Sequence, residues 1–172
     1  MLNQYREKAV HTAGRIESHP TISLFGTPEN IFYYFEIRKH LEINAAILAA
    51  HNATNEDIAK LEEHIVLMRN TVRFYHLWEK STDQFHRSIT EATHSALYTH
   101  LITTLHDLFR ITVHSTLRRV AKNRIGLQHD IVDQYEAIAS AIGNHNASMA
   151  GNAAESHLDY VENVWKRTLG IV

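Results

Sequence analysis

The chain of 172 residues, with a formal net charge of −2 at pH 7, fits one domain and is a poor candidate for binding nucleic acid by itself. Its lack of cysteine excludes disulfides, thiolate metal sites and cysteine nucleophiles. No apolar run approaches the length of a membrane span and the N-terminus lacks a signal-peptide core, so we expect a cytoplasmic protein that does not contact the membrane.

Two further counts set expectations for the fold and the site. With only 2 prolines and 6 glycines, long helices can run without interruption. The 14 histidines are far more than usual, which makes a metal or acid-sensing site worth testing.

Residues 1–27 carry the weakest pattern. They are polar with little periodicity up to Ser18, and Pro20 and Gly26 break any helix that reaches them. We predict a linker, with room for a short helix, that leads into a domain spanning residues 28–172.

The first strong helix signal begins at Pro28, which suits a first helical turn, with Thr27 as its N-cap. Helical spacing of apolar residues continues to about residue 50. A second helix follows a capping box formed by Thr54 and Asp57. These two apolar stripes consist of Ile37, Leu41, Ala45 and Leu48, then Ile58, Leu61, Ile65 and Met68.

A third helix is predicted over residues 71–92, and Ser95 can cap a fourth. The fourth places Leu97, Leu101, Leu105 and Leu108 along one face, and it can continue towards residue 120. The basic stretch 118–126 ends in glycine and is the longest predicted loop.

A fifth helix is predicted over residues 128–142, ending at a Gly143-Asn144 C-cap, and a sixth over residues 146–169. No strand-like alternation of apolar and polar residues is found beside these stripes. The sequence therefore predicts an all-α bundle of six or seven helices.

Three segments together carry a family pattern. They are Phe35-Glu36-Ile37-Arg38-Lys39-His40-Leu41-Glu42 with alanines after it, Phe85-His86-Arg87-Ser88-Ile89, and residues 135–143 followed by His157-Leu158. Their order and spacing resemble the FCD domain, the C-terminal effector-binding half of FadR-type GntR transcription regulators. The pattern is nearest to members that respond to pyruvate or lactate.

The resemblance implies an antiparallel helical bundle whose central cavity binds a small organic acid, often beside a divalent metal such as zinc or nickel. It also implies a homodimer. Members of the family bind operator DNA through an N-terminal winged helix-turn-helix, for which residues 1–27 are too short. We therefore expect a fragment, or a regulator that lacks its DNA reader.

The resemblance also suggests the cavity residues. Effector-binding positions fall on Arg38, His86, Tyr135 and His157. Metal-binding members use an aspartate one turn before the first histidine and one histidine from each of the last two helices. Here His86 and His157 match, whereas the other two positions hold Thr82 and Tyr135.

Asp83 is one residue away from the family's carboxylate position, so His86, His157 and Asp83 form an incomplete candidate metal site. In the alternative, the two histidines hydrogen-bond each other, Tyr135 or a water in a polar cavity that binds an acid directly. Arg38 is suited either to a carboxylate ligand or to an ion pair with Glu42 at i+4. Both interpretations stay open.

Arg118, Arg119 and Arg124 lie in the basic loop and can close over an acidic effector or remain solvated. No nucleophile elbow or glycine-rich phosphate loop is present, so enzyme activity is not predicted. The alternative functions are a metal-dependent helical-bundle enzyme that uses His86, Asp83 and His157, and a helical interaction module without a ligand.

Overall fold

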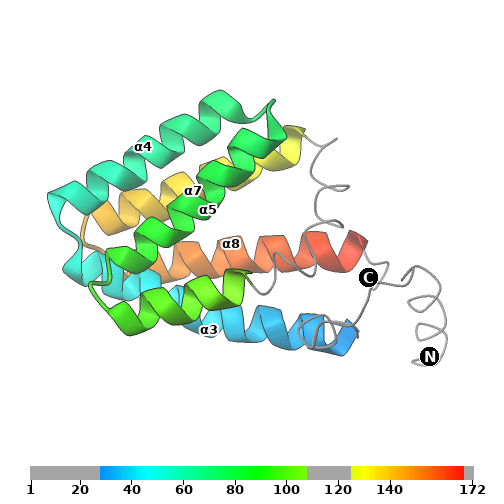
Figure 1. Cartoon of the computed structure of the whole chain (residues 1–172), viewed down its shortest axis with the longest axis horizontal. Coiled ribbons are helices and arrows are strands. Elements are labelled where there is room, and N and C mark those ends of the chain that lie inside the picture. Colours follow the sequence, from blue (N-terminus) through cyan, green and yellow to red (C-terminus); the bar gives the residue numbers. More distant parts are fainter. Residues whose placement is uncertain (1–27, 108–124, 169–172) are drawn as a thin grey trace.

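The computed structural model describes residues 28–107 and 125–168, and within them every regular element is a helix. Five helices are α3 (Pro28–Asn52), α4 (Asn55–Thr71), α5 (Tyr75–Glu91), α7 (Ile125–Gly143) and α8 (Ala147–Thr168). A further helical segment, here called helix 96–107, follows α5. The all-α prediction is confirmed, and Figure 1 shows α3, α8 and helix 96–107 running beside one another.

Local signals in the sequence set several helix ends correctly. In α4, the Thr54 N–H donates to Asp57 Oδ2 at 2.9 Å and the Asp57 N–H donates to Thr54 Oγ1 at 3.3 Å, which forms the predicted capping box. The third predicted helix begins at Tyr75 instead of residue 71, because a turn in which the Phe74 N–H donates to Thr71 O separates it from α4.

The turn between α7 and α8 differs from its prediction in one detail. Gly143 is the last residue of α7, and the left-handed residue that ends the helix is His145, with φ of 52°. The Asn146 N–H donates to Ala141 O and the His145 N–H to Ile142 O, both at 2.9 Å, which is a Schellman motif. Histidine tolerates this conformation better than most residues.

Helix 96–107 departs from the prediction at the first two leucines of the stripe, whereas the third, Leu105, is partly buried against a cluster of Tyr34, Phe35 and Trp165. Leu97 and Leu101 are 66% and 44% exposed, whereas Ile102 is buried. The bundle instead receives Ile102 and, one turn later, His106, which contacts Glu42. The predicted basic loop falls mostly within residues 108–124, outside the described residues, and its last two residues belong to α7.

Small residues allow α3 and α8 to pack closely. A Cβ atom added at Gly151 of α8 would lie 3.0 Å from Ile47 Cγ1 and Cδ1 of α3. Buried small residues are also concentrated on these two helices, and we call them the alanine seam: Ala45, Ala46, Ala49 and Ala50 of α3, with Ala150, Gly151 and Ala154 of α8. Gly151, which has no side chain, lets α3 and α8 approach closely at its contact with Ile47. The two turns of α3 that precede the seam carry Arg38 and Glu42 to the bundle centre.

Candidate functional site

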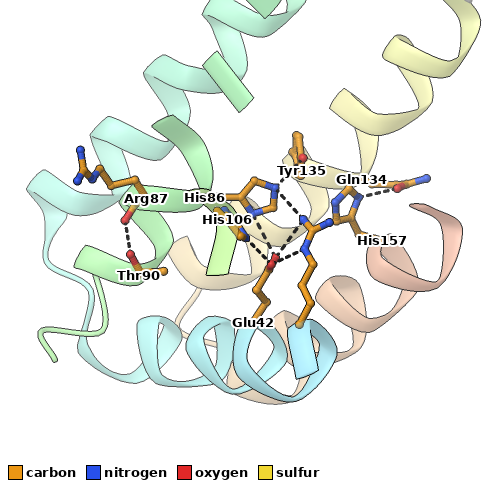
Figure 2. Close-up of polar contacts among 9 residues, drawn as sticks. Glu42, His86, Arg87, Thr90, His106, Gln134, Tyr135 and His157 are labelled. Carbon is orange, nitrogen blue, oxygen red and sulfur yellow. Dashed lines mark hydrogen bonds and ion pairs between the residues drawn. The ribbon is translucent and has the colours of Figure 1, made fainter. Parts of the chain in front are cut away.

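Six polar side chains from five helices meet at the centre of the bundle, and Figure 2 shows most of the contacts between them. We call them the polar cluster: Arg38 and Glu42 of α3, His86 of α5, His106 of helix 96–107, Tyr135 of α7 and His157 of α8. Buried polar groups are expensive unless they are paired. In a cluster of this size inside an apolar core, each polar atom therefore needs a hydrogen-bond or charge partner.

Glu42 is the hub of the cluster, as Figure 2 shows. Its Oε1 accepts from Arg38 Nε and lies 2.7 Å from His106 Nε2. Its Oε2 lies 3.3 Å from His86 Nδ1. The ion pair between Arg38 and Glu42, one of the two interpretations of the sequence, is therefore present.

Charge at the hub is fixed by this arrangement. Burial alone would raise the pKa of Glu42, but Arg38, His106 and His86 outweigh it and hold that pKa well below its usual range. Burial likewise opposes the charge of Arg38, and Glu42 raises its pKa. The pair is thus one anion and one cation whose charges cancel.

His86 connects the hub to α7. Its Nε2 lies 2.9 Å from the Tyr135 hydroxyl and 3.4 Å from Arg38 Nη2. Burial lowers the pKa of His86 to about 4, so the ring is neutral at pH 7. One consistent assignment has Nδ1–H donating to Glu42 and Nε2 accepting from Tyr135, whose own pKa burial raises.

His157 has one nitrogen engaged and one free. Its Nδ1 lies 2.9 Å from Gln134 Oε1, so that nitrogen donates. Its Nε2 is buried and makes no hydrogen bond within the described part of the chain. Burial also lowers the pKa of His157, so Nε2 presents an unshared lone pair.

Two hollows adjoin the cluster. An inner cavity of about 20 Å³, lined by Glu42, His86 and His157 among apolar side chains, has room for about one water molecule. An outer groove of about 290 Å³ lies between α5 and helix 96–107 and is lined partly by His106. Thr90 and Ile102 line both hollows.

The structure brings together the four predicted effector-binding residues, Arg38, His86, Tyr135 and His157. Asp83, the predicted metal carboxylate, is exposed and lines the outer groove. Sequence reasoning did not place His106 in this site and saw Glu42 only as a partner of Arg38. The i+4 spacing pointed to Glu42, but nothing local distinguished His106 from the other histidines.

Metal-ligand chemistry is present in a different set from the predicted one. Within residues 28–107 and 125–168, Glu42, His86 and His106 each offer a ligand atom, and these atoms all lie within 4.8 Å of one another. The family-type set lacks its carboxylate, because Thr82 stands there and its hydroxyl donates to Glu79 O at 2.7 Å. The residues at the family-type position therefore do not fit a complete metal shell.

Comparison with known proteins adds three findings. Residues 34–160 match the FCD domain. The HTH-type transcriptional regulator LutR of Bacillus subtilis (strain 168) is 27% identical over 136 residues, which cover 79% of this chain and 62% of that protein. The chain thus spans less than two thirds of this relative's length.

The third finding is a likeness in fold. The structure of E. coli McbR/YncC superposes with a TM-score of 0.70 over 82% of this chain and 70% of that one, at 14% sequence identity. Among the described residues, no helix combines the length and apolar character that crossing a membrane requires.

Proposed function

Because the chain belongs to the FCD domain family, we propose that it is the ligand-sensing and dimerisation domain of a bacterial transcription regulator of the GntR/FadR type. The family resemblance drawn from the sequence is confirmed by that match. In this proposal, a small organic acid enters the polar cluster in the cytoplasm. Its binding then changes the operator affinity of a winged helix-turn-helix in the complete regulator.

The free Nε2 of His157 is the observation that carries the proposal. No protein group within the described residues donates to this nitrogen, so it is available to a ligand or to a water in the inner cavity that the ligand would displace. A ligand with a hydroxyl group would satisfy Nε2 on binding. The proposal therefore favours small acids that carry a hydroxyl beside the carboxylate over keto acids, which offer no donor there.

Arg38 is the proposed partner of the ligand's carboxylate. Its guanidinium can bind a carboxylate through two parallel hydrogen bonds, and it currently binds Glu42. The carboxylate of an incoming acid would compete with Glu42 for the N–H groups of the Arg38 guanidinium. Glu42 would keep His86 and His106 as partners, so the exchange need not leave a buried charge alone.

The size of the inner cavity couples binding to movement. About 20 Å³ holds one water, and a three-carbon acid is several times larger. Binding therefore requires that neighbouring helices separate, most directly at Thr90 and Ile102, which divide the cavity from the outer groove. A ligand that binds only the widened state shifts the population towards it.

Dimerisation is proposed through the exposed leucine face of helix 96–107. Leu97 and Leu101 lie one helical turn apart and are both exposed. A chain with both residues changed to lysine is expected to run as a monomer in light scattering, whereas Met149→Lys, at an exposed position of α8, leaves a dimer. If both variants remain dimeric, this face is not the interface.

Isothermal titration with L-lactate, pyruvate, propionate and lactamide tests the ligand proposal. We expect lactate to bind more tightly than pyruvate or propionate and the neutral amide not to bind. Arg38→Gln should abolish binding, whereas Arg69→Gln, on an exposed arginine paired with Asp133 and Glu136, should not. No heat from any acid would contradict the proposal, and consumption of an acid with a bound redox metal would support the enzyme alternative.

A further inference from the structure

We propose that Glu42, His86 and His106 form a binding site for one divalent first-row transition metal ion of the zinc class. The site lies on the Nδ1 side of His86, away from the pair formed by His86 and His157. It would exist whether or not the chain binds an organic acid, so it does not rest on the function proposed above.

The three residues can each bring one ligand atom to such an ion, because these atoms all lie within 4.8 Å of one another. Glu42 Oε2 lies 3.3 Å from His86 Nδ1, and Glu42 Oε1 lies 2.7 Å from His106 Nε2. Ligand atoms bound at roughly 2.0–2.2 Å around a tetrahedral zinc ion are about 3.3 Å apart. The ion would displace the ring proton that now lies between His106 and Glu42, and the His86 proton would move from Nδ1 to Nε2. His106 Nε2 and Glu42 Oε1 would move apart from their present 2.7 Å.

Partners outside the ligand set are already in place. A metal-bound histidine usually donates its other ring N–H to a fixed acceptor, which orients the ring. With the ion on Nδ1, His86 Nε2–H would donate to the Tyr135 hydroxyl oxygen, 2.9 Å away. Arg38 acts differently, because its guanidinium already binds the Glu42 carboxylate and competes with the ion for it.

The opposite side of His86 offers fewer ligands. There, Nε2 already contacts Tyr135 and Arg38, and His157 supplies a single free nitrogen. Asp83 is exposed and lines the outer groove. Two imidazoles and a carboxylate therefore converge only on the Glu42 side within the described residues, and this set is typical of divalent zinc and iron sites.

The outer groove provides a path to the site. His106 lines the groove and also reaches Glu42. Asp83 and Asp107 on its wall attract cations, while Lys80 and Arg87 on the same wall oppose them. Because Thr90 and Ile102 line both the groove and the inner cavity, an ion in the groove is one layer of side chains from Glu42.

Arg38 weakens the affinity of the proposed site for a metal ion. Its cation shares the Glu42 carboxylate with the incoming ion, so it lowers the affinity of the site for metal. Arg38→Met removes that competitor and leaves Glu42 for the ion. The variant should bind metal more tightly than the unmodified chain, which is the opposite of what loss of a supporting residue does.

The test is a titration of the full chain with Co²⁺, followed by visible d–d absorption, and displacement of the Co²⁺ by Zn²⁺. One equivalent is expected to bind. His106→Gln should weaken binding by more than the roughly 10–100-fold lost with an outer partner, whereas His157→Gln should leave it unchanged. His100→Gln, at an exposed position of the same helix as His106, is the matched control.

Several results would overturn the site. Loss of binding in His157→Gln with full binding in His106→Gln would place the ion on the other side of His86. Equal, small losses in all three histidine variants would indicate adventitious binding to surface histidines. Absence of a stoichiometric Co²⁺ spectrum, or weaker binding by a folded Arg38→Met chain, would also contradict the proposal.

Discussion

The alanine seam and the polar cluster both include residues of α3, and they differ in how tightly their side chains are packed. Along the seam, α3 and α8 approach so closely that a Cβ atom at Gly151 would touch Ile47. The cluster lies one turn earlier on α3, around Glu42. There, Nε2 of His157, a residue of α8, has no protein partner within the described residues and lies beside a small cavity. The contact at Gly151 is tightly packed, whereas the cluster adjoins a small cavity, lined also by Ala45, Ala46 and Ala154, and holds an acceptor that no protein group in the described part of the chain pairs.

The largest expected effect on the free energy of unfolding comes from removing one partner of the buried ion pair between Arg38 and Glu42. Glu42→Leu leaves Arg38 buried without its carboxylate and should lower the free energy of unfolding by about 3–5 kcal/mol. The double variant Arg38→Met/Glu42→Leu should recover most of that loss, because it removes both charges. Urea unfolding of the single and double variants measures the difference. A double variant as unstable as the single one would mean that the pair stabilises the fold.

The next effect comes from overfilling the seam. Ala49 is fully buried, and Ala49→Leu should lower the free energy of unfolding by about 1–3 kcal/mol because the packed core must shift to admit the larger side chain. Ala96→Leu, at an exposed position, should change it little. Acid affinity of the folded chain should be unaffected by either variant. A neutral Ala49→Leu would show that the seam has spare room.

Asp57 provides a reference for an ordinary structural polar group. Burial opposes its charge, but hydrogen bonds from Thr54 and His94 lower the pKa of Asp57. Asp57→Asn should cost about 1 kcal/mol at pH 7. Because its folded pKa lies below the unfolded value, this stabilisation is complete above the unfolded pKa and is lost as the pH falls through the folded one. Urea unfolding at pH 7 and pH 3 checks this, and an equal cost at both values would contradict it.

The smallest effect on stability is expected at His157. His157→Leu removes an unpaired buried acceptor, so the free energy of unfolding should stay the same or rise by up to about 1 kcal/mol. Acid binding should nevertheless be lost. Thermal unfolding with and without lactate separates the two effects. A large fall in stability would mean that His157 belongs to the structure and not to the site.

Much of the fold was predictable because its determinants are local. The capping box of Thr54 and Asp57 and the apolar stripes of the helices depend on residues within a few positions of one another. Helix 96–107 was the exception. Its leucine stripe predicted the buried face, but Leu97 and Leu101 face outward while Ile102 is buried. The contact of His106 with Glu42, a distant residue of α3, could not be read from the segment itself.

The site was predictable only where the family pattern marks it. Arg38, His86, Tyr135 and His157 follow from the resemblance, and they do converge. Glu42 as the hub and His106 as its partner required three helices to be placed in space. Asp83 was chosen for its spacing from His86, but on a helix that step points the side chain towards the outer groove.

The central claim is that the polar cluster is a ligand site, and the ring nitrogens of His157 report on it directly. In the chain labelled with ¹⁵N-histidine, the His157 Nε2 resonance should shift on addition of L-lactate, because the ligand's hydroxyl donates to this nitrogen. Nδ1 should change little, since Gln134 already holds it. A saturating concentration of lactate that leaves the Nε2 resonance unmoved would contradict the account.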